Sequence, residues 1–247
     1  MKKCECMRIV PGSRTAVLMI HGIMGKPSYF APFLDLVPED MTLCNVLLPG
    51  HCSSLHDFCH STMKQWRQHV FDALEQLLKT HDNIIIFGYS LGALFAVEAA
   101  IQHPDRVTQL FCTALPLKMR MPPASKIRVW RIMFDKILPD TPTERMMGAC
   151  GTETTKKLWK YLGTYPRMVE LAREMYRTKK RMPLLQVPCQ SYQGALDEML
   201  SRRNTRYLQQ FPTVSAIILP HSGHFAIDGR DLPQIRLDFA KLLEQYR

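Results

Sequence analysis

The 247-residue sequence has no long hydrophobic run. No uninterrupted apolar stretch reaches the roughly 18 residues that a membrane-spanning helix needs, so we expect no transmembrane segment. Residues 1–10 include two lysines but no apolar segment like the core of a signal peptide, and we therefore expect a cytoplasmic protein. Internal repeats and low-complexity stretches are also missing. With 46% hydrophobic and 22% charged residues, the composition is that of a folded globular protein.

A disulfide framework is not expected either. The eight cysteines are spread over a long chain, whereas disulfide scaffolds are typical of short secreted domains. Metal-binding residue types are dense at one place, but their spacing matches no standard zinc finger. We favour a loop without metal over a zinc site there, and we expect no cofactor. The residues of this cluster are His51, Cys52, His56, Asp57, Cys59 and His60.

Acidic residues are scarce in one segment only. The chain carries 32 Lys and Arg against 22 Asp and Glu, a net formal charge of +10. Residues 115–185 hold 16 of these basic residues and 6 of the acidic ones, which leaves 16 of each elsewhere. We interpret the charge as solvated outer faces of helices. The alternatives are that it attracts an anionic substrate or makes a weak contact with an anionic membrane surface. No recognised binding motif accompanies it, so we expect no nucleic-acid partner.

Short apolar stretches alternate with helical patterns along most of the chain. Continuous hydrophobic strands separated by helices favour an α/β fold with a mostly parallel central sheet covered on both faces. Residues 115–183 break the alternation and contain eight of the 15 methionines. We predict a helical cap inserted at 115–183 into a core made of 1–114 and 184–247. The expected strands are Thr15–Ile20, 41–48, 83–87, 107–114, 184–193 and Val214–Leu219, and the expected helices are 62–79, 93–103 and 232–246.

One motif indicates a candidate catalytic residue. Residues 88–92 read G-Y-S-L-G, which matches G-x-S-x-G between a predicted strand and a predicted helix. Small residues are needed there because the serine lies on a tight turn close to neighbouring elements. The helix that follows points its N-terminus at the serine, which favours a developing negative charge. Ser90 is therefore the candidate nucleophile.

A serine hydroxyl needs a base, and the base needs an acid that orients it. In hydrolases with this motif the order along the chain is serine, acid, histidine. Asp197 and His224 each follow a predicted strand and fit that order. Glu198 is a rival acid that falls at what looks like the start of a helix, and His221 is a rival base. We favour Asp197, and we favour His224 because the glycine before it lets the loop turn inward.

The tetrahedral oxyanion also needs hydrogen-bond donors. One is expected from the backbone N–H of Leu91, directly after the nucleophile. The other is expected from a loop after an early strand, and residues 21–25, H-G-I-M-G, supply such a loop. Ile23 is the candidate for this second N–H. The remaining histidines, at 51, 56, 60, 69, 81 and 103, are expected at the surface or in loops.

Taken together, these motifs resemble the α/β-hydrolase superfamily and, within it, the carboxylesterase and monoacylglycerol-lipase-like group. The resemblance runs through HGIMG, LPGHCSS, GYSLG, GALDEM and HSGHF, and so covers nearly the whole chain. It implies a catalytic Ser90, Asp197 and His224, with oxyanion amides at Ile23 and Leu91. One departure is Cys52, which stands where the group has the second glycine of G-H-G-x-S.

The expected activity is that of a serine esterase. Short to medium acyl esters or monoacylglycerol-like molecules are the expected substrates, with an anionic or apolar acyl part. The methionines of the predicted cap either form an adaptable apolar pocket or simply pack against the core. Alternatives with the same three residues are a thioesterase or a C–C bond hydrolase. A binding protein without catalysis is the remaining alternative.

Overall fold

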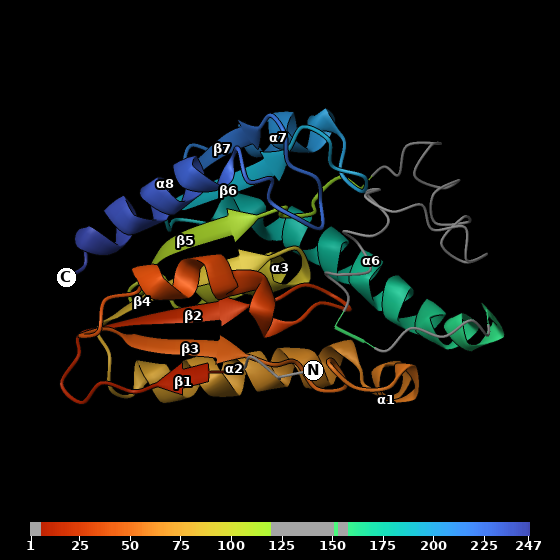
Figure 1. The fold of residues 1–247 in the computed structure, drawn as a ribbon, viewed down its shortest axis with the longest axis horizontal. Helices are drawn as coiled ribbons and strands as arrows, with labels where there is room; N and C mark the ends of the chain where they lie inside the picture. The colour runs from red at the N-terminus through yellow and green to blue at the C-terminus, as the bar shows by residue number, and fades with distance from the viewer. Residues whose placement is uncertain (1–5, 120–150, 153–157) are drawn as a thin grey trace.

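A computed structural model of the chain describes residues 6–119, 151–152 and 158–247 (Figure 1). Its seven strands form one sheet in the order β1-β3-β2-β4-β5-β6-β7. β1 runs antiparallel to β3, and all the other neighbours are parallel. The predicted α/β fold with a mostly parallel sheet flanked by helices is therefore confirmed.

The strands alternate with helices along the chain. The strands are β1 (Cys6–Arg8), β2 (Thr15–Ile20), β3 (Thr42–Val46), β4 (Asn83–Tyr89), β5 (Val107–Thr113), β6 (Cys189–Gly194) and β7 (Val214–Leu219). The α-helices are α1 (Leu55–His60), α2 (Met63–Leu78), α3 (Leu91–Gln102), α6 (Tyr165–Arg181), α7 (Arg202–Leu208) and α8 (Leu232–Glu244). The 3-10 helices are η1 (Pro27–Leu36), η2 (Leu158–Thr164) and η3 (Met182–Leu184).

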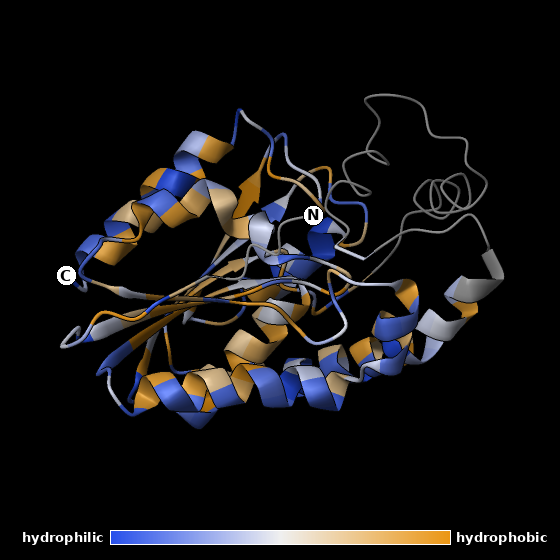
Figure 2. Cartoon of the chain, turned by 60° about the horizontal axis from the view of Figure 1, so that its bottom comes forward, coloured by the Kyte–Doolittle hydropathy of each residue, from blue (hydrophilic) through white to orange (hydrophobic). Residues whose placement is uncertain are grey.

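The alternation of side chains along each strand divides the core into two layers. On β2, Leu18 and Ile20 join the cluster that includes α2, α3 and α6. Val17 and Met19 point the other way, into the cluster with η1 and α8. Every residue of β2 is buried, as expected of a strand covered on both faces. Figure 2 shows the hydrophobic strands between helices of mixed hydropathy.

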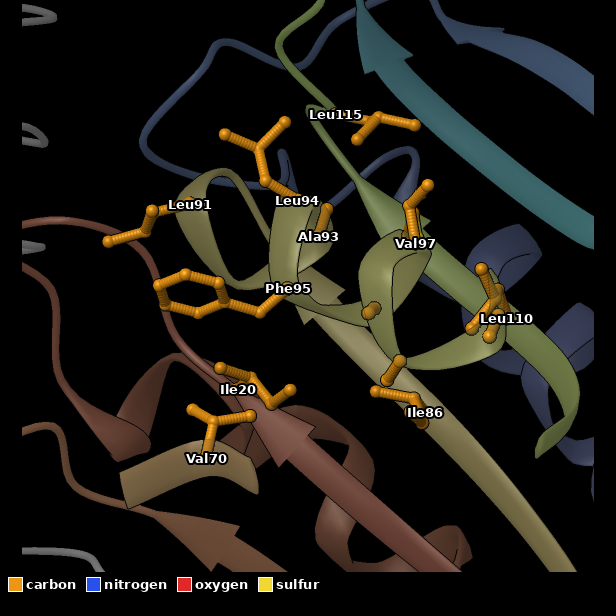
Figure 3. Close-up of a cluster of buried hydrophobic side chains, with 14 of the residues drawn as sticks. Ile20, Val70, Ile86, Leu91, Ala93, Leu94, Phe95, Val97, Leu110 and Leu115 are labelled. Carbon is orange, nitrogen blue, oxygen red and sulfur yellow. The ribbon is translucent and has the colours of Figure 1, made fainter. Parts of the chain in front are cut away.

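Helix α3 lies at the centre of one layer. Ten consecutive residues from its start are buried, and a helix that is apolar on all sides belongs inside a protein. Figure 3 shows Phe95 of α3 near Ile20 of β2 and Val70 of α2, while Leu94 lies on the side of Leu115. This packing fixes the N-terminus of α3, which follows directly after Ser90.

A buried carboxylate ties α6 to this layer. The Glu98 side chain on α3 is 1% exposed and pairs with Arg67 of α2 at 3.1 Å. From α6, Arg177 and Arg181 reach the same carboxylate at 2.6 and 2.8 Å. Two of the basic side chains of the middle segment are thus paired with a buried carboxylate. In the described residues, no helix is long and apolar enough to cross a membrane.

Some predicted elements differ from the structure. The strand expected over 184–193 begins only at Cys189, because η3 precedes it and the Leu185 N–H donates to the Met182 carbonyl at 3.1 Å. The elements β1, η1 and α1 are not predicted, and the helix start read at Glu198 is the only sign of α7. They are short or, like η1, interrupted by proline, and so carry little periodicity. Most of the predicted insertion, 120–150 and 153–157, lies outside the described residues, and its boundaries stay a prediction.

Candidate active site

Ser90 occupies the turn between β4 and α3. Its φ of +51° lies in a region that non-glycine residues rarely adopt, so the hydroxyl is presented by a strained backbone. The turn needs glycine at position 92, since a Cβ there would lie 1.9 Å from the Ile20 carbonyl oxygen. This close approach brings the start of α3 against the end of β2. The strained turn predicted from G-x-S-x-G is present.

Three predicted site residues meet above the sheet. Ser90 Oγ lies 3.2 Å from His224 Nε2, and His224 Nδ1 lies 3.0 Å from Asp197 Oδ2. The carboxylate accepts from Nδ1–H, which leaves Nε2 as the acceptor for the serine hydroxyl. All three residues are at most 7% exposed. Asp197 follows β6 and His224 follows β7, so the site forms at the carboxyl ends of parallel strands.

The loop after β6 holds Asp197 in place. Its Oδ1 accepts the backbone N–H groups of Met199 and Leu200 at 2.8 and 2.6 Å. The interpretation of Glu198 as the start of a helix was wrong, because α7 begins only at Arg202. Glu198 instead accepts the backbone N–H of His224 at 2.8 Å.

The electrostatics of His224 favour a stronger base. Burial lowers its pKa, but the charge of Asp197 and the hydrogen bond to it raise it, and the charge of Glu198 adds to this. The net result is a pKa above the ordinary value of 6.5. The pairing with Asp197 therefore outweighs the loss of solvation.

His221, the rival base, lies outside this chain of hydrogen bonds. Its backbone N–H donates to Asp231 Oδ2 at 2.9 Å, and the Ser222 hydroxyl donates to the same oxygen at 2.6 Å. The Asp228 N–H in turn donates to Ser222 Oγ at 3.1 Å. These bonds close the loop that presents His224.

The loop after β2 packs directly on the nucleophile. A Cβ at Gly22 would lie 3.1 Å from Ser90 Cβ and 2.9 Å from the Tyr89 ring, so a larger residue would have to displace these side chains. The loop turns tightly, with the Gly25 N–H donating to the Gly22 carbonyl at 3.0 Å. Ile23 thus lies in a loop that touches the Ser90 turn, and Leu91 is the first residue of α3.

A pair of tyrosine rings supports the site from beneath. Tyr89, next to Ser90, stacks on Tyr29 with ring centroids 3.9 Å apart. The Tyr29 hydroxyl lies 3.1 Å from Thr113 Oγ1. Burial raises the pKa of both phenols, so they stay neutral. Nothing in the sequence motifs pointed to Tyr29, because its contact with Tyr89 exists only after folding.

Two histidines expected at the surface or in loops are buried. His51 is 2% and His81 is 3% exposed, although both lie outside helices and strands. Neither ring nitrogen of His51 is free for a metal, since one accepts from Met24 N–H and the other bonds to the Pro49 carbonyl. In the described part of the chain, no three His, Cys, Asp or Glu side chains are grouped as metal ligands.

Known proteins of similar sequence or structure carry several activities. Monoacylglycerol lipase abhd6-B from Xenopus laevis is 28% identical over 112 residues, which are 44% of this chain and 33% of that protein. The match thus spans about a third of that relative's length. A putative 2-succinyl-6-hydroxy-2,4-cyclohexadiene-1-carboxylate synthase from Bacillus subtilis (strain 168) is 24% identical over 249 residues, covering 87% of this chain and 85% of that protein.

A solved structure from the metagenome-derived lipolytic enzymes LipS and LipT shares the fold. Its TM-score is 0.74 at 19% identity, with 97% of both chains covered. At that identity the likeness speaks for the fold alone. The model of the alpha/beta hydrolase family, however, matches residues 17–233, which is most of the chain. The chain therefore belongs to the α/β hydrolase family.

Proposed function

We propose that the protein is a serine hydrolase that cleaves carboxylic esters through an acyl-enzyme on Ser90. The observation that carries the proposal is the hydrogen-bonded chain from Ser90 through His224 to Asp197, with distances of 3.2 and 3.0 Å. A nucleophile, a base and an orienting acid within hydrogen-bonding reach are what acyl transfer requires.

The first half of the reaction forms the acyl-enzyme. Ser90 Oγ attacks the ester carbonyl while His224 Nε2 takes the hydroxyl proton. Asp197 holds Nδ1–H and stabilises the positive imidazolium. The oxyanion is stabilised by the N–H groups of Ile23 and Leu91, each of which is worth about 2.7–4 kcal/mol in such sites. The C–O bond then breaks, and His224 gives its proton to the leaving alkoxide.

The second half releases the acid. Water loses a proton to His224 Nε2 and attacks the acyl carbon, giving a second tetrahedral intermediate at the same amides. This intermediate expels Ser90 Oγ, which recovers its proton from His224. The net reaction is ester plus water to acid plus alcohol. The raised pKa of His224 suits a base that must accept a proton twice.

Small to medium acyl esters and monoacylglycerol-like esters are the proposed substrates. The monoacylglycerol lipase among the relatives supports this class. The synthase relative covers more of the chain, which keeps a different reaction with the same three residues as the alternative. Thioesters and vinylogous diketones represent that alternative in an assay.

The test is a panel of p-nitrophenyl esters of increasing acyl length, extended with monoacylglycerols, acyl thioesters and a vinylogous diketone. We expect ester turnover, and a loss on the order of 10⁴-fold or more in Ser90→Ala. Ser191→Ala is the matched control, because Ser191 is also buried but lies within β6, outside the hydrogen-bonded chain. Wild-type turnover by Ser90→Ala contradicts the assignment of Ser90 as the nucleophile. Turnover of only the thioester or the diketone contradicts the ester specificity.

A further inference from the structure

Two buried histidines outside the proposed catalytic chain join the loop after β2 to the loop after β3. His21 Nε2 accepts the Leu48 N–H at 3.1 Å, and His51 Nε2 accepts the Met24 N–H at the same distance. The two rings meet edge to face with centroids 5.0 Å apart. His21 is fully buried and His51 is 2% exposed. Each histidine thus bridges the two loops.

The partners of these rings fix their protonation. A backbone N–H can only donate, so Nε2 of each ring is unprotonated and Nδ1 carries the hydrogen. Accordingly, the nearest partner of each Nδ1 is a carbonyl, that of Gly22 for His21 at 2.9 Å and that of Pro49 for His51 at 3.2 Å. Burial lowers the pKa of His21 to about 4. Burial, with the charge of His21 adding to it, holds the pKa of His51 well below 6.5. Both rings are therefore neutral acceptors near pH 7.

These bonds act on the two peptide groups that flank Ile23. The Gly22 carbonyl belongs to the same peptide as the Ile23 N–H, and in a trans peptide the two point in opposite directions. By donating to that carbonyl, which also accepts the Gly25 N–H, His21 helps to fix the direction of the Ile23 N–H. The next peptide carries the Met24 N–H, which His51 accepts. Met24 has a φ of +53°, an unfavourable conformation that needs such support.

His51 is itself held firmly. The Pro49 carbonyl that faces its Nδ1–H also accepts the indole N–H of Trp66 at 2.8 Å. The imidazole packs edge to face on Phe58 and Trp66, with centroids 5.2 and 4.9 Å away. Its ring therefore has one orientation in which Nε2 points at Met24. On the other side of the loop, the Met24 carbonyl accepts the Gly151 N–H at 2.7 Å.

We propose that His21 and His51 are positioning residues that aim the Ile23 N–H at the oxyanion formed on the acyl group. This inference rests on the proposed function, because the oxyanion arises only in that reaction. The hydrogen-bond partners of the His21 and His51 rings are backbone groups of Gly22, Met24, Leu48 and Pro49. The histidines act through the loop backbone. Their loss is expected to lower transition-state stabilisation and leave substrate binding nearly unchanged.

The experiment compares His51→Phe with His81→Phe. Phenylalanine fills the aromatic site around His51 but accepts no hydrogen bond. His81 is a matched control because it is equally buried and bonds to the Leu77 carbonyl and to Thr42, which begins β3 and so lies at the end of the strands away from Ser90. Both variants are expected to lower the melting temperature. Only His51→Phe is expected to lower kcat, by about 10²-fold, with KM close to wild type.

A second variant and a second ligand separate positioning from folding. Glutamine places an oxygen near the position of Nε2, so His51→Gln is expected to restore most of the lost kcat. A trifluoromethyl ketone, which forms an oxyanion on the serine, is expected to bind His51→Phe more weakly by the same factor as kcat falls. A folded His51→Phe with wild-type kcat and wild-type ketone affinity overturns the inference. If the wild-type protein hydrolyses no ester, just like Ser90→Ala, and a fluorophosphonate does not label Ser90, then the proposed function fails and not the role of the two histidines.

Discussion

The carboxylate of Glu198 accepts the backbone N–H of His224 at 2.8 Å. The preceding residue, Asp197, accepts from the imidazole of the same histidine. Two neighbouring acids thus hold one residue at two places, one at its main chain and one at its ring. The Glu198 carboxylate lies so close to the backbone of Gly223 that a Cβ there would stand 2.9 Å from it. The glycine predicted to let the loop turn inward also makes room for this acid.

Substitution of Glu198 separates its charge from its hydrogen bond. In Glu198→Gln the side-chain oxygen still accepts the His224 N–H, but the negative charge that helps raise the pKa of His224 is gone. The acid limb of the kcat/KM profile is therefore expected to move to lower pH with a nearly unchanged plateau. Glu198→Ala leaves the N–H unpaired and is expected to cost about 1–3 kcal/mol of stability, measured by urea unfolding. Identical pH profiles for wild type and Glu198→Gln contradict the claim that the charge of Glu198 raises the pKa of His224.

The wild-type pH profile follows from the raised pKa of His224. As the proposed general base, His224 must be neutral, so activity is expected to rise with pH as His224 loses its proton, with a midpoint above 6.5. The contribution of His224 to stability is expected to change with pH in the opposite direction. A folded-state pKa above the unfolded value contributes stability that is fully present below pH 6.5 and is lost as pH rises through the folded pKa. Both are measured on one protein, by kcat/KM and by the melting temperature. An activity midpoint well below 6.5 contradicts the assignment.

Asp197→Asn tests the orienting acid. The amide keeps the shape of the carboxylate, but without its charge burial dominates, and the pKa of His224 is expected to fall. The rate is expected to drop on the order of 10⁴-fold, as when the acid of such a triad is neutralised. Any residual activity is expected to show its acid limb at lower pH than wild type. A variant within tenfold of the wild-type rate argues against Asp197 as the acid.

The sequence predicted the elements that have strong periodicity and the site residues that have strong motifs. Ser90, Asp197 and His224 were selected by strand ends and chain order, and the structure brings their side chains together. Position along the chain says little about partners, however. The local sequence pattern places Glu198 at a helix start, but its contact is with His224, 26 residues further along the chain.

The buried histidines show the same limit. H-G-x-x-G indicates the loop after β2 as the source of a backbone N–H, but the motif assigns no role to the His21 side chain. In the sequence, His51 belongs to a cluster of residue types that bind metals, because its neighbours include cysteine, histidine and aspartate. In the fold its partner is Met24, 27 residues earlier, across two loops that adjacent parallel strands bring together. Only the strand order places these loops side by side, and periodicity does not determine strand order.

The buried Glu98 is expected to matter for stability far more than exposed acids do. Glu98→Gln removes the buried carboxylate that Arg67, Arg177 and Arg181 share and is expected to cost about 1.5–3 kcal/mol, since the arginines are partly exposed and Arg67 keeps Glu174 as a partner. Glu75→Gln is the control, since Glu75 is 55% exposed and is expected to change stability by about 1 kcal/mol or less. Urea unfolding of both variants measures the difference. Equal effects would show that the arginines are held by other contacts.

Asn204 links the segment after β5 to the loop that carries Asp197. Its Oδ1 accepts the N–H groups of Leu117 and Lys118 at 2.9 and 2.8 Å. Its Nδ2 donates to the Leu115 carbonyl and to Gln193 Oε1 at 2.9 and 3.0 Å. All four hydrogen-bonding positions of this fully buried amide are thus used.

The side-chain nitrogen of Gln193 contacts the end of the loop that carries Asp197. Its Nε2 donates to the Ser201 carbonyl at 3.2 Å, beyond Asp197 along the chain. Asn204→Ala leaves several buried groups unpaired, at about 1–3 kcal/mol each, and is expected to lower both stability and kcat. Thr205→Val is the matched control, because it removes one hydrogen bond to the same Gln193 oxygen and none to residues 115–118. Unfolding and ester turnover are measured on both. If Asn204→Ala is no more harmful than Thr205→Val, the bonds to residues 115–118 contribute nothing, and the Asp197 loop is held by its own backbone.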